Sequence, residues 1–97
     1  MIRFTWDEVK ANRNIFKHTV SFEEAATVFY DPLSATIDDP DHSSAREQRC
    51  LIVGYSDRRR LLIVSHTAQS GTIRIISARK ATAHERKRHE EETGRTY

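Results

Sequence analysis

The sequence has 97 residues, of which 37% are hydrophobic and 31% are charged, and its formal net charge is +2. A chain of this length forms one small domain with a single core, so a sizeable substrate must bind in a surface groove. No apolar run is long enough to span a membrane, and the N-terminus has no secretory signal, so we expect a cytoplasmic protein. The single cysteine, Cys50, excludes an internal disulfide and a cysteine-based metal cluster.

The charges are divided unevenly along the chain. Residues 1–45 hold four Lys or Arg against eight Asp or Glu, whereas residues 46–97 hold twelve against six. An acidic half joined to a basic half indicates an anionic ligand on one side of the molecule. The alternative is a chance segregation of many charged side chains, and charge alone does not decide between the two.

The N-terminal segment predicts a strand followed by a helix. Residues 3–6 alternate so that Phe4 and Trp6 share a face, and two aromatic rings on one face indicate core. Asp7 is a favourable N-cap for a helix that runs to about Lys17. The residues expected to face the core from this helix are Val9, Ile15 and Phe16.

The next segment predicts a second, shorter helix. Ser21 and Glu24 have the spacing of a capping box, and Val20 and Ala25 occupy the two positions of a hydrophobic staple. The Asp31-Pro32 pair ends the helix, because a residue before proline is disfavoured in the helical region. The apolar residues that recur at helical spacing, and are expected to be buried, are Phe22, Ala25, Ala26 and Phe29.

The remaining chain predicts a meander of strands and a last helix. Strands are expected at 33–37, 49–55, 61–66 and 72–78, with an acidic loop at 38–44 and hairpin turns at 56–60 and 68–71. Thr82 and Glu85 form another capping box, which begins a helix over about 83–92 with almost no apolar face. Such a helix is largely solvated or docks on a partner. Residues 93–97 are expected to form a frayed tail.

These elements define the expected fold. Their order, β-α-α-β-β-β-β-α, indicates an α+β class in a single domain over residues 1–97. We expect a curved antiparallel sheet with the helices packed on one face.

The strongest enzyme motifs are missing from the sequence. Gly54, Gly71 and Gly94 are isolated, so there is no glycine-rich phosphate loop. The sequence also has no HExxH, no Cys-x-x-Cys and no G-x-S-x-G. We therefore expect no metal and no cofactor, and each of the five histidines taken singly is read as structural.

Basic side chains are more informative, because arginine suits planar, bidentate contacts with phosphate. Those on the predicted sheet and its ends are Arg46, Arg49, Arg58, Arg59, Arg60, Arg74, Arg79 and Lys80. Strict alternation puts Arg74 and Arg79 on opposite faces, so they serve one site only if a bulge re-aims the strand end. Arg79 ends its strand just before a capped helix, which favours a functional role over a solvated sheet edge. Residues 58–60 lie in a turn, so for these arginines we favour a solvated surface role over a functional one.

Five segments together resemble one known family. They are F-T-W-D at 4–7, K-H-T-V-S-F-E-E-A at 17–25, F-Y-D-P-L at 29–33, D-P-D-H-S at 39–43 and R-I-I-S-A-R-K-A-T at 74–82. In combination they resemble BrnT, the ribonuclease toxin family of bacterial type II toxin–antitoxin pairs. The sequence departs from the family at Thr19, where a glycine is usual, and at Ala68-Gln69, where Glu-Arg is frequent. These departures would reduce activity if those positions belong to the site.

The resemblance implies a RelE-like fold and cleavage of RNA without a metal, which inhibits translation and growth. It also implies neutralisation by BrnA, a ribbon-helix-helix antitoxin, in a complex that binds operator DNA through the antitoxin. Metal-free cleavage uses the 2′-hydroxyl as nucleophile, and it needs a base, an acid and cations for the phosphorane charge.

Residue roles follow from this chemistry. We predict Arg79 and Arg49 as phosphate clamps, His18 or His66 as base or acid, and Glu47 as a further candidate for the base. The predicted RNA-binding residues are Lys17, Arg46, Tyr55 and Lys80, of which Tyr55 is either a stacking residue or part of the core.

Two other classes of function fit the same charge pattern. One is a nucleic-acid-binding module without catalysis, which uses the arginines for phosphates only. The other is a protein-interaction partner whose basic sheet docks an acidic helix. A neighbouring reading frame for a ribbon-helix-helix protein, or cleavage of labelled RNA in EDTA, discriminates among them.

Overall fold

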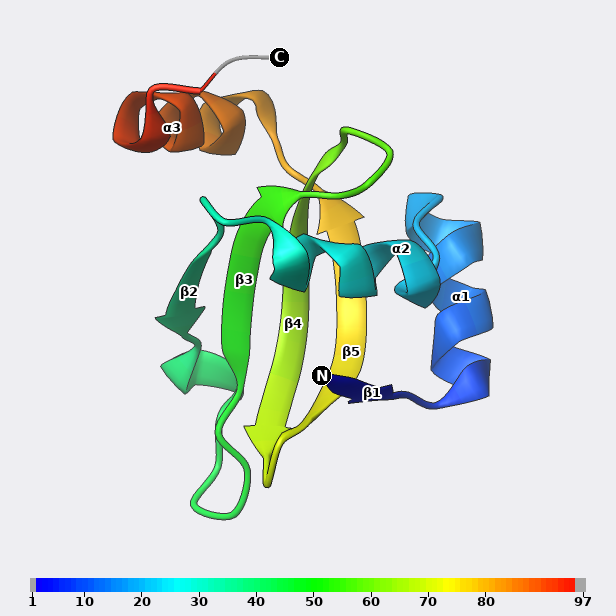
Figure 1. Ribbon diagram of the computed structural model, residues 1–97. Helices are drawn as coiled ribbons and strands as arrows, with labels where there is room; N and C mark the ends of the chain where they lie inside the picture. Colours follow the sequence, from blue (N-terminus) through cyan, green and yellow to red (C-terminus); the bar gives the residue numbers. More distant parts are fainter. Residues whose placement is uncertain (1, 96–97) are drawn as a thin grey trace.

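A five-stranded sheet and three helices make up residues 2–95, the part of the chain that the computed structural model describes (Figure 1). The strands are β1 (Arg3–Thr5), β2 (Ala35–Asp38), β3 (Cys50–Tyr55), β4 (Leu61–Gln69) and β5 (Thr72–Lys80). The helices are α1 (Glu8–His18), α2 (Phe22–Thr27) and α3 (Ala83–Thr93), with 3-10 turns at Val28–Tyr30 and Pro40–His42. The predicted α+β class is confirmed.

The strands lie in the order β1-β5-β4-β3-β2, and their directions are mixed. Strands β2 to β5 pair antiparallel with their successive neighbours, but β1 pairs parallel to β5. The prediction of an entirely antiparallel sheet is therefore wrong at β1. Most of the chain separates β1 from β5, and a connection of that length permits the parallel direction that a tight hairpin forbids. The RelE-like label stays a prediction.

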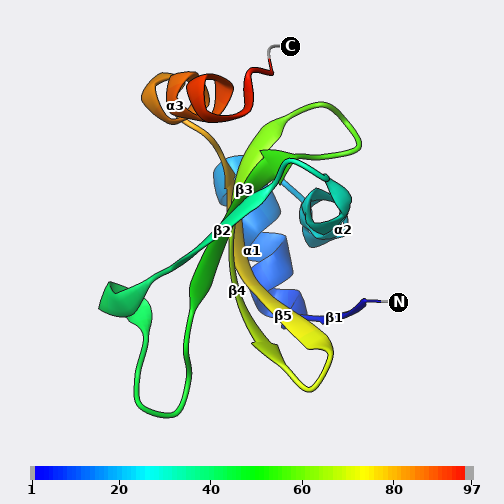
Figure 2. The same cartoon turned by 60° about the vertical axis from the view of Figure 1, so that its left-hand side comes forward.

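Helices α1 and α2 cover one face of the sheet and enclose the core with it, whereas α3 lies beyond the end of the sheet (Figure 2). Val53 and Ile63 alternate with the core residues Ile52 and Leu62, so they point to the opposite face. There His89 of α3 joins them in lining a small cavity of about 200 Å³. The expectation of helices on one face holds for α1 and α2 and is wrong for α3.

The N-terminal strand and cap follow the prediction, but the buried side of α1 does not. Phe4 and Trp6 pack against the core, and Asp7 caps the helix by accepting from the backbone N–H of Val9 and Lys10. The expected core residues of α1 are exposed: Val9 by 59%, Ile15 by 47% and Phe16 by 93%. The helix instead buries Ala11 and Asn14. The buried side of α1 is narrow because the helix rests on the edge of β5. At this edge the Asn14 amide can pair with backbone groups of the strand, which an apolar side chain cannot do.

Helix α2 begins as predicted, with the Ser21 hydroxyl accepting from the Glu24 N–H at 3.0 Å. The Glu24 carboxylate does not complete a capping box. It pairs with the Arg60 guanidinium and accepts from the Ser56 hydroxyl at 2.7 Å. Arg60 also donates to the carbonyl of Thr19, so this arginine of the β3–β4 turn is a structural tie.

The C-terminal helix is better anchored than its composition indicates. Both hydrogen bonds of the Thr82–Glu85 capping box form, and Gly94 ends α3 with a φ of 70°. Arg95 pairs with the Asp31 carboxylate, so the predicted frayed tail is wrong at residues 93–95, and residues 96–97 lie outside the described part. Within residues 2–95, the longest helices have eleven residues, too few to cross a membrane.

Candidate functional site

Four of the predicted site residues line one surface groove. The end of α1 supplies Lys17 and His18, and the end of β5 supplies Arg79 and Lys80. Thr19 and Thr82 complete a lining that encloses about 450 Å³. Two segments about sixty residues apart in the sequence therefore meet here, because α1 lies along the edge of β5 and both elements end at the same place (Figure 1).

Arg79 is held by an ion pair at the border of this groove. Its Nη1 and Nη2 donate to the two Glu85 carboxylate oxygens at 2.8 and 3.0 Å, and Glu85 also accepts from the Thr82 N–H at 2.8 Å. The arginine lowers the pKa of Glu85 to about 2, and the carboxylate raises the pKa of Arg79. The Arg79 side chain remains 41% exposed. A phosphate that approaches it must share the guanidinium with Glu85 or displace that carboxylate.

A bulge in β5 changes which face its arginines occupy. Ser77 pairs with Ser65 and Ile75 pairs with His66, so Ile76 is inserted between them without a partner across the ladder. Strict alternation is broken at that point. Ile75 and Ala78 both enter the core, and consequently Arg74 and Arg79 both lie on the opposite face. The prediction that they point to different faces is wrong, and the bulge is its physical reason.

A second basic cluster gathers around Arg74. It lines a narrow pocket of about 70 Å³ together with Lys10, Glu47 and Arg49, and Arg49 Nε donates to Glu47 Oε1 at 3.1 Å. Sequence reasoning did not select Lys10 or Arg74 for the site. For Lys10 a signal was present in the sequence. Lys10 precedes Lys17 by seven residues, and this spacing puts the two lysines on the same side of α1.

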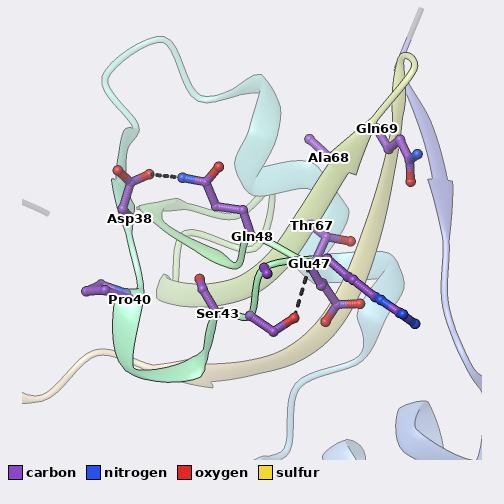
Figure 3. A pocket seen from close by; sticks show the side chains of 11 residues that line it. Asp38, Pro40, Ser43, Glu47, Gln48, Thr67, Ala68 and Gln69 are labelled. Atoms are coloured by element: carbon purple, nitrogen blue, oxygen red, sulfur yellow. Dashed lines mark hydrogen bonds between the residues drawn. The ribbon is translucent and has the colours of Figure 1, made fainter.

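Arg46 lies apart from both basic clusters, on a larger hollow of about 720 Å³. The loop after β2 and the end of β4 form this hollow, which is lined largely by polar side chains. Across it, Gln48 Nε2 donates to Asp38 Oδ1 at 3.4 Å, as the dashed line in Figure 3 shows. Arg46 and Lys80 therefore do not share a pocket.

His66 lies inside the protein, on the face of the sheet that α2 covers. The side chain is 4% exposed, and its ring is 4.8 Å from the Phe29 ring in an edge-on arrangement. Burial lowers the pKa of His66, and its Nδ1 lies 3.1 Å from the Val64 carbonyl oxygen. An RNA phosphate on the surface does not reach this ring, so the prediction of His66 as base or acid is corrected to a core histidine.

Tyr55 is also buried, beneath α3. Its ring is 5.8 Å from the His89 ring, and the Arg95 guanidinium lies over it at 4.6 Å. Its hydroxyl accepts from Arg86 at 3.4 Å. The His89 and Arg95 contacts occupy the ring surfaces that a nucleobase would need, so Tyr55 is part of the core and is not a base-stacking residue. Through these contacts the polar helix α3 docks on its own sheet.

Among residues 2–95, no group of three or more His, Cys, Asp and Glu is arranged to hold a metal ion.

Comparison with known proteins gives the family. Residues 6–85 match a family model, which is described as "Ribonuclease toxin, BrnT, of type II toxin-antitoxin system". The chain belongs to the BrnT family. The crystal structure of the Brucella abortus ribonuclease toxin BrnT matches with a TM-score of 0.60 at 21% identity, over 84% of this chain and 99% of that chain. At that identity the likeness shows a shared BrnT fold. No curated protein matches the sequence.

The BrnT match includes every predicted site residue, from Lys17 to Lys80. The departures from the BrnT pattern lie in different places. Ala68 and Gln69 line the large hollow with Arg46, and they are absent from the lining of the groove with Arg79. Thr19 lines that groove and ends α1 with a φ of 59°, a conformation that suits glycine better than a β-branched residue.

Proposed function

We propose that this chain is a metal-independent endoribonuclease toxin whose cleavage centre is the groove between α1 and β5. The observation that carries the proposal is the meeting of Lys17, His18, Arg79 and Lys80 in one groove. Three side chains with positive charge around one imidazole match the needs of phosphodiester cleavage, which are charge stabilisation and proton transfer.

The reaction uses the substrate's own 2′-hydroxyl. His18 takes the 2′-hydroxyl proton, because imidazole is the side chain suited to proton transfer near neutral pH. The freed oxygen attacks the adjacent phosphorus, and Lys17, Arg79 and Lys80 stabilise the charge of the phosphorane. The bond to the 5′-oxygen then breaks as that oxygen takes a proton from an ammonium in the groove. The products are a 2′,3′-cyclic phosphate and a free 5′-hydroxyl.

The second basic cluster binds flanking phosphates in this proposal through Lys10, Arg49 and Arg74, while Glu47 pairs with Arg49. This cluster lines a different pocket from His18, and Arg74 lies five residues from Arg79 along β5, roughly 15 Å in an extended strand. Arg49, which was predicted as a catalytic phosphate clamp, therefore binds the RNA backbone at a distance from the cleaved bond, and Glu47 positions Arg49 instead of acting as the base. Arg46, on a separate hollow, stays a predicted RNA-binding residue outside both basic clusters.

The partner is a BrnA-like, ribbon-helix-helix antitoxin that covers the basic face and silences the toxin. Its own DNA-binding part carries the complex to operator DNA, and the free toxin cuts messages in the cytoplasm and stops translation. Charge complementarity favours this arrangement, because an acidic antitoxin segment is steered to the same cations that hold RNA.

The test is incubation of the purified chain with a single-stranded RNA labelled at its 5′ end, in EDTA. We expect fragments that end in a 2′,3′-cyclic phosphate. Their absence with folded protein, or their appearance only when a divalent metal is added, contradicts the mechanism. Binding of the RNA without cleavage assigns the chain to the non-catalytic binding module.

A further inference from the structure

Phe16 is the most exposed large apolar residue in the described part of the chain, at 93%. It stands on the outer side of α1, where it lines a shallow depression of about 550 Å³ with Asn12, Arg13 and Lys17. Isolated apolar side chains on a surface are common. This one has a cation next to it in the sequence and another three residues before it, on the same helix face.

The depression around Phe16 adjoins the proposed cleavage groove at Lys17. Lys17 lines both of them, with Phe16 on one side and with His18, Arg79 and Lys80 on the other. Neither Arg13 nor Lys17 forms an ion pair within residues 2–95, so their charges are available to an anionic ligand. A polyanion that leaves the groove past Lys17 therefore meets the Phe16 ring next.

We propose that Phe16 is a stacking platform for a base of single-stranded RNA whose neighbouring phosphate lies in the groove. The inference rests on the proposed function, because that function puts RNA in the groove. Proteins that bind single strands combine a positively charged groove with exposed aromatic rings on which bases stack. Every base has a flat π-face, so Phe16 accepts any base and adds affinity without sequence preference.

The surroundings of Phe16 favour a base over a partner helix. A docking helix would need an apolar stripe, and the exposed apolar residues Val9 and Ile15 are absent from the lining of the depression. The ring is instead bordered by two cations and an amide. This combination fits a flat, aromatic ligand joined to phosphates.

The experiment uses the full chain and a short 2′-O-methyl single-stranded RNA, which binds but cannot be cleaved through its 2′-oxygen. Phe16→Ala and Phe16→Leu should each bind this RNA about 5- to 100-fold more weakly than wild type, because both lack an aromatic ring. Phe16→Trp should retain the affinity, and RNA should quench its additional indole fluorescence. Ile15→Ala, on the same helix but outside the depression, is the matched control and should bind as wild type does.

Cleavage of an ordinary RNA adds a second readout. The Phe16→Leu variant should raise KM and leave kcat near wild type, with an unchanged melting temperature. Wild-type affinity for RNA in Phe16→Leu, while wild type itself cleaves RNA, overturns the platform and leaves the proposed function standing. Failure of wild type to cleave any RNA overturns the proposed function itself. Phe16 variants that lose only antitoxin affinity overturn the platform and assign this face to the antitoxin.

Discussion

The Asn14 side chain pairs with the Ala78 backbone as a neighbouring strand would. Asn14 Nδ2 donates to the Ala78 carbonyl at 2.8 Å, and the Ala78 N–H donates to Asn14 Oδ1 at 3.1 Å. Strand β1 pairs with β5 only as far as Arg74, so the amide continues the ladder where the strand ends. The same Nδ2 donates to the Val20 carbonyl at 2.9 Å. This contact holds α1 against β5 and thereby brings His18 and Arg79 to the same groove.

Replacing Asn14 should therefore destabilise the fold. Asn14→Leu leaves the Ala78 N–H and two carbonyls buried without their partner, and we expect a loss of about 2–4 kcal/mol in the free energy of unfolding. Chemical denaturation measures this change. Asn12→Ala, at an exposed site on the same helix, should stay within about 0.5 kcal/mol of wild type. Equal stability of the Asn14→Leu variant and wild type would show that the amide is not a structural tie.

Arg79 should matter for cleavage far more than for stability. Removing a preorganised cation from a transition state costs about 100- to 1000-fold in rate, and we expect a loss of this size for Arg79→Ala. Arg79→Lys should recover only part of it, because an ammonium cannot reproduce the planar fork. Single-turnover cleavage rates together with thermal melts check this. A wild-type rate in a folded Arg79→Ala variant removes Arg79 from the site.

Glu85 should restrain Arg79. Glu85→Gln keeps an oxygen for the Thr82 N–H and removes the charge that holds the guanidinium. An exposed ion pair of this kind contributes at most about 1 kcal/mol, so RNA binding should become about two- to fivefold tighter. The KM for a cleavable RNA reports the change. Weaker binding would mean that Glu85 positions Arg79 for RNA rather than competing with it.

The Asp31–Arg95 pair should make stability depend on acid. The arginine and two backbone N–H groups lower the pKa of Asp31 from 3.8 to about 2, and its side chain is 5% exposed. The stabilisation is therefore complete above about pH 4 and is lost as the pH falls towards 2, a loss of about 2 kcal/mol. Denaturation at several pH values measures this loss. Asp31→Asn should be less stable at neutral pH and should lose less stability below pH 4, and an unchanged acid dependence would contradict the assignment.

Features that depend on neighbouring residues in the chain could be predicted from the sequence, and features that depend on distant residues could not. Asp7, Ser21 and Thr82 cap their helices as predicted, because a cap depends on residues within one turn. The buried side of α1 was not predictable, since Asn14 is buried by a partner sixty-four residues away. The common face of Arg74 and Arg79 depends in the same way on a bulge that only strand pairing reveals.

The candidate site shows the same division. Lys17, His18, Arg79 and Lys80 were selected from the sequence, and the structure joins them in one groove. His66 has the same chemistry as His18, but its position in the fold puts it beneath Phe29. Composition cannot distinguish these two histidines, because burial is decided by the packing of the whole sheet.

In the proposed reaction, His18 in the groove performs proton transfer during RNA cleavage. This role is tested by the single-turnover cleavage rate of His18→Ala in EDTA, with a thermal melt of the same sample. The matched control is His84→Ala, an exposed histidine in the first turn of α3. We predict that His18→Ala loses about 100-fold or more in rate, while it melts as wild type and His84→Ala cleaves normally. A folded His18→Ala variant that retains the wild-type rate would show that His18 transfers no proton in the reaction.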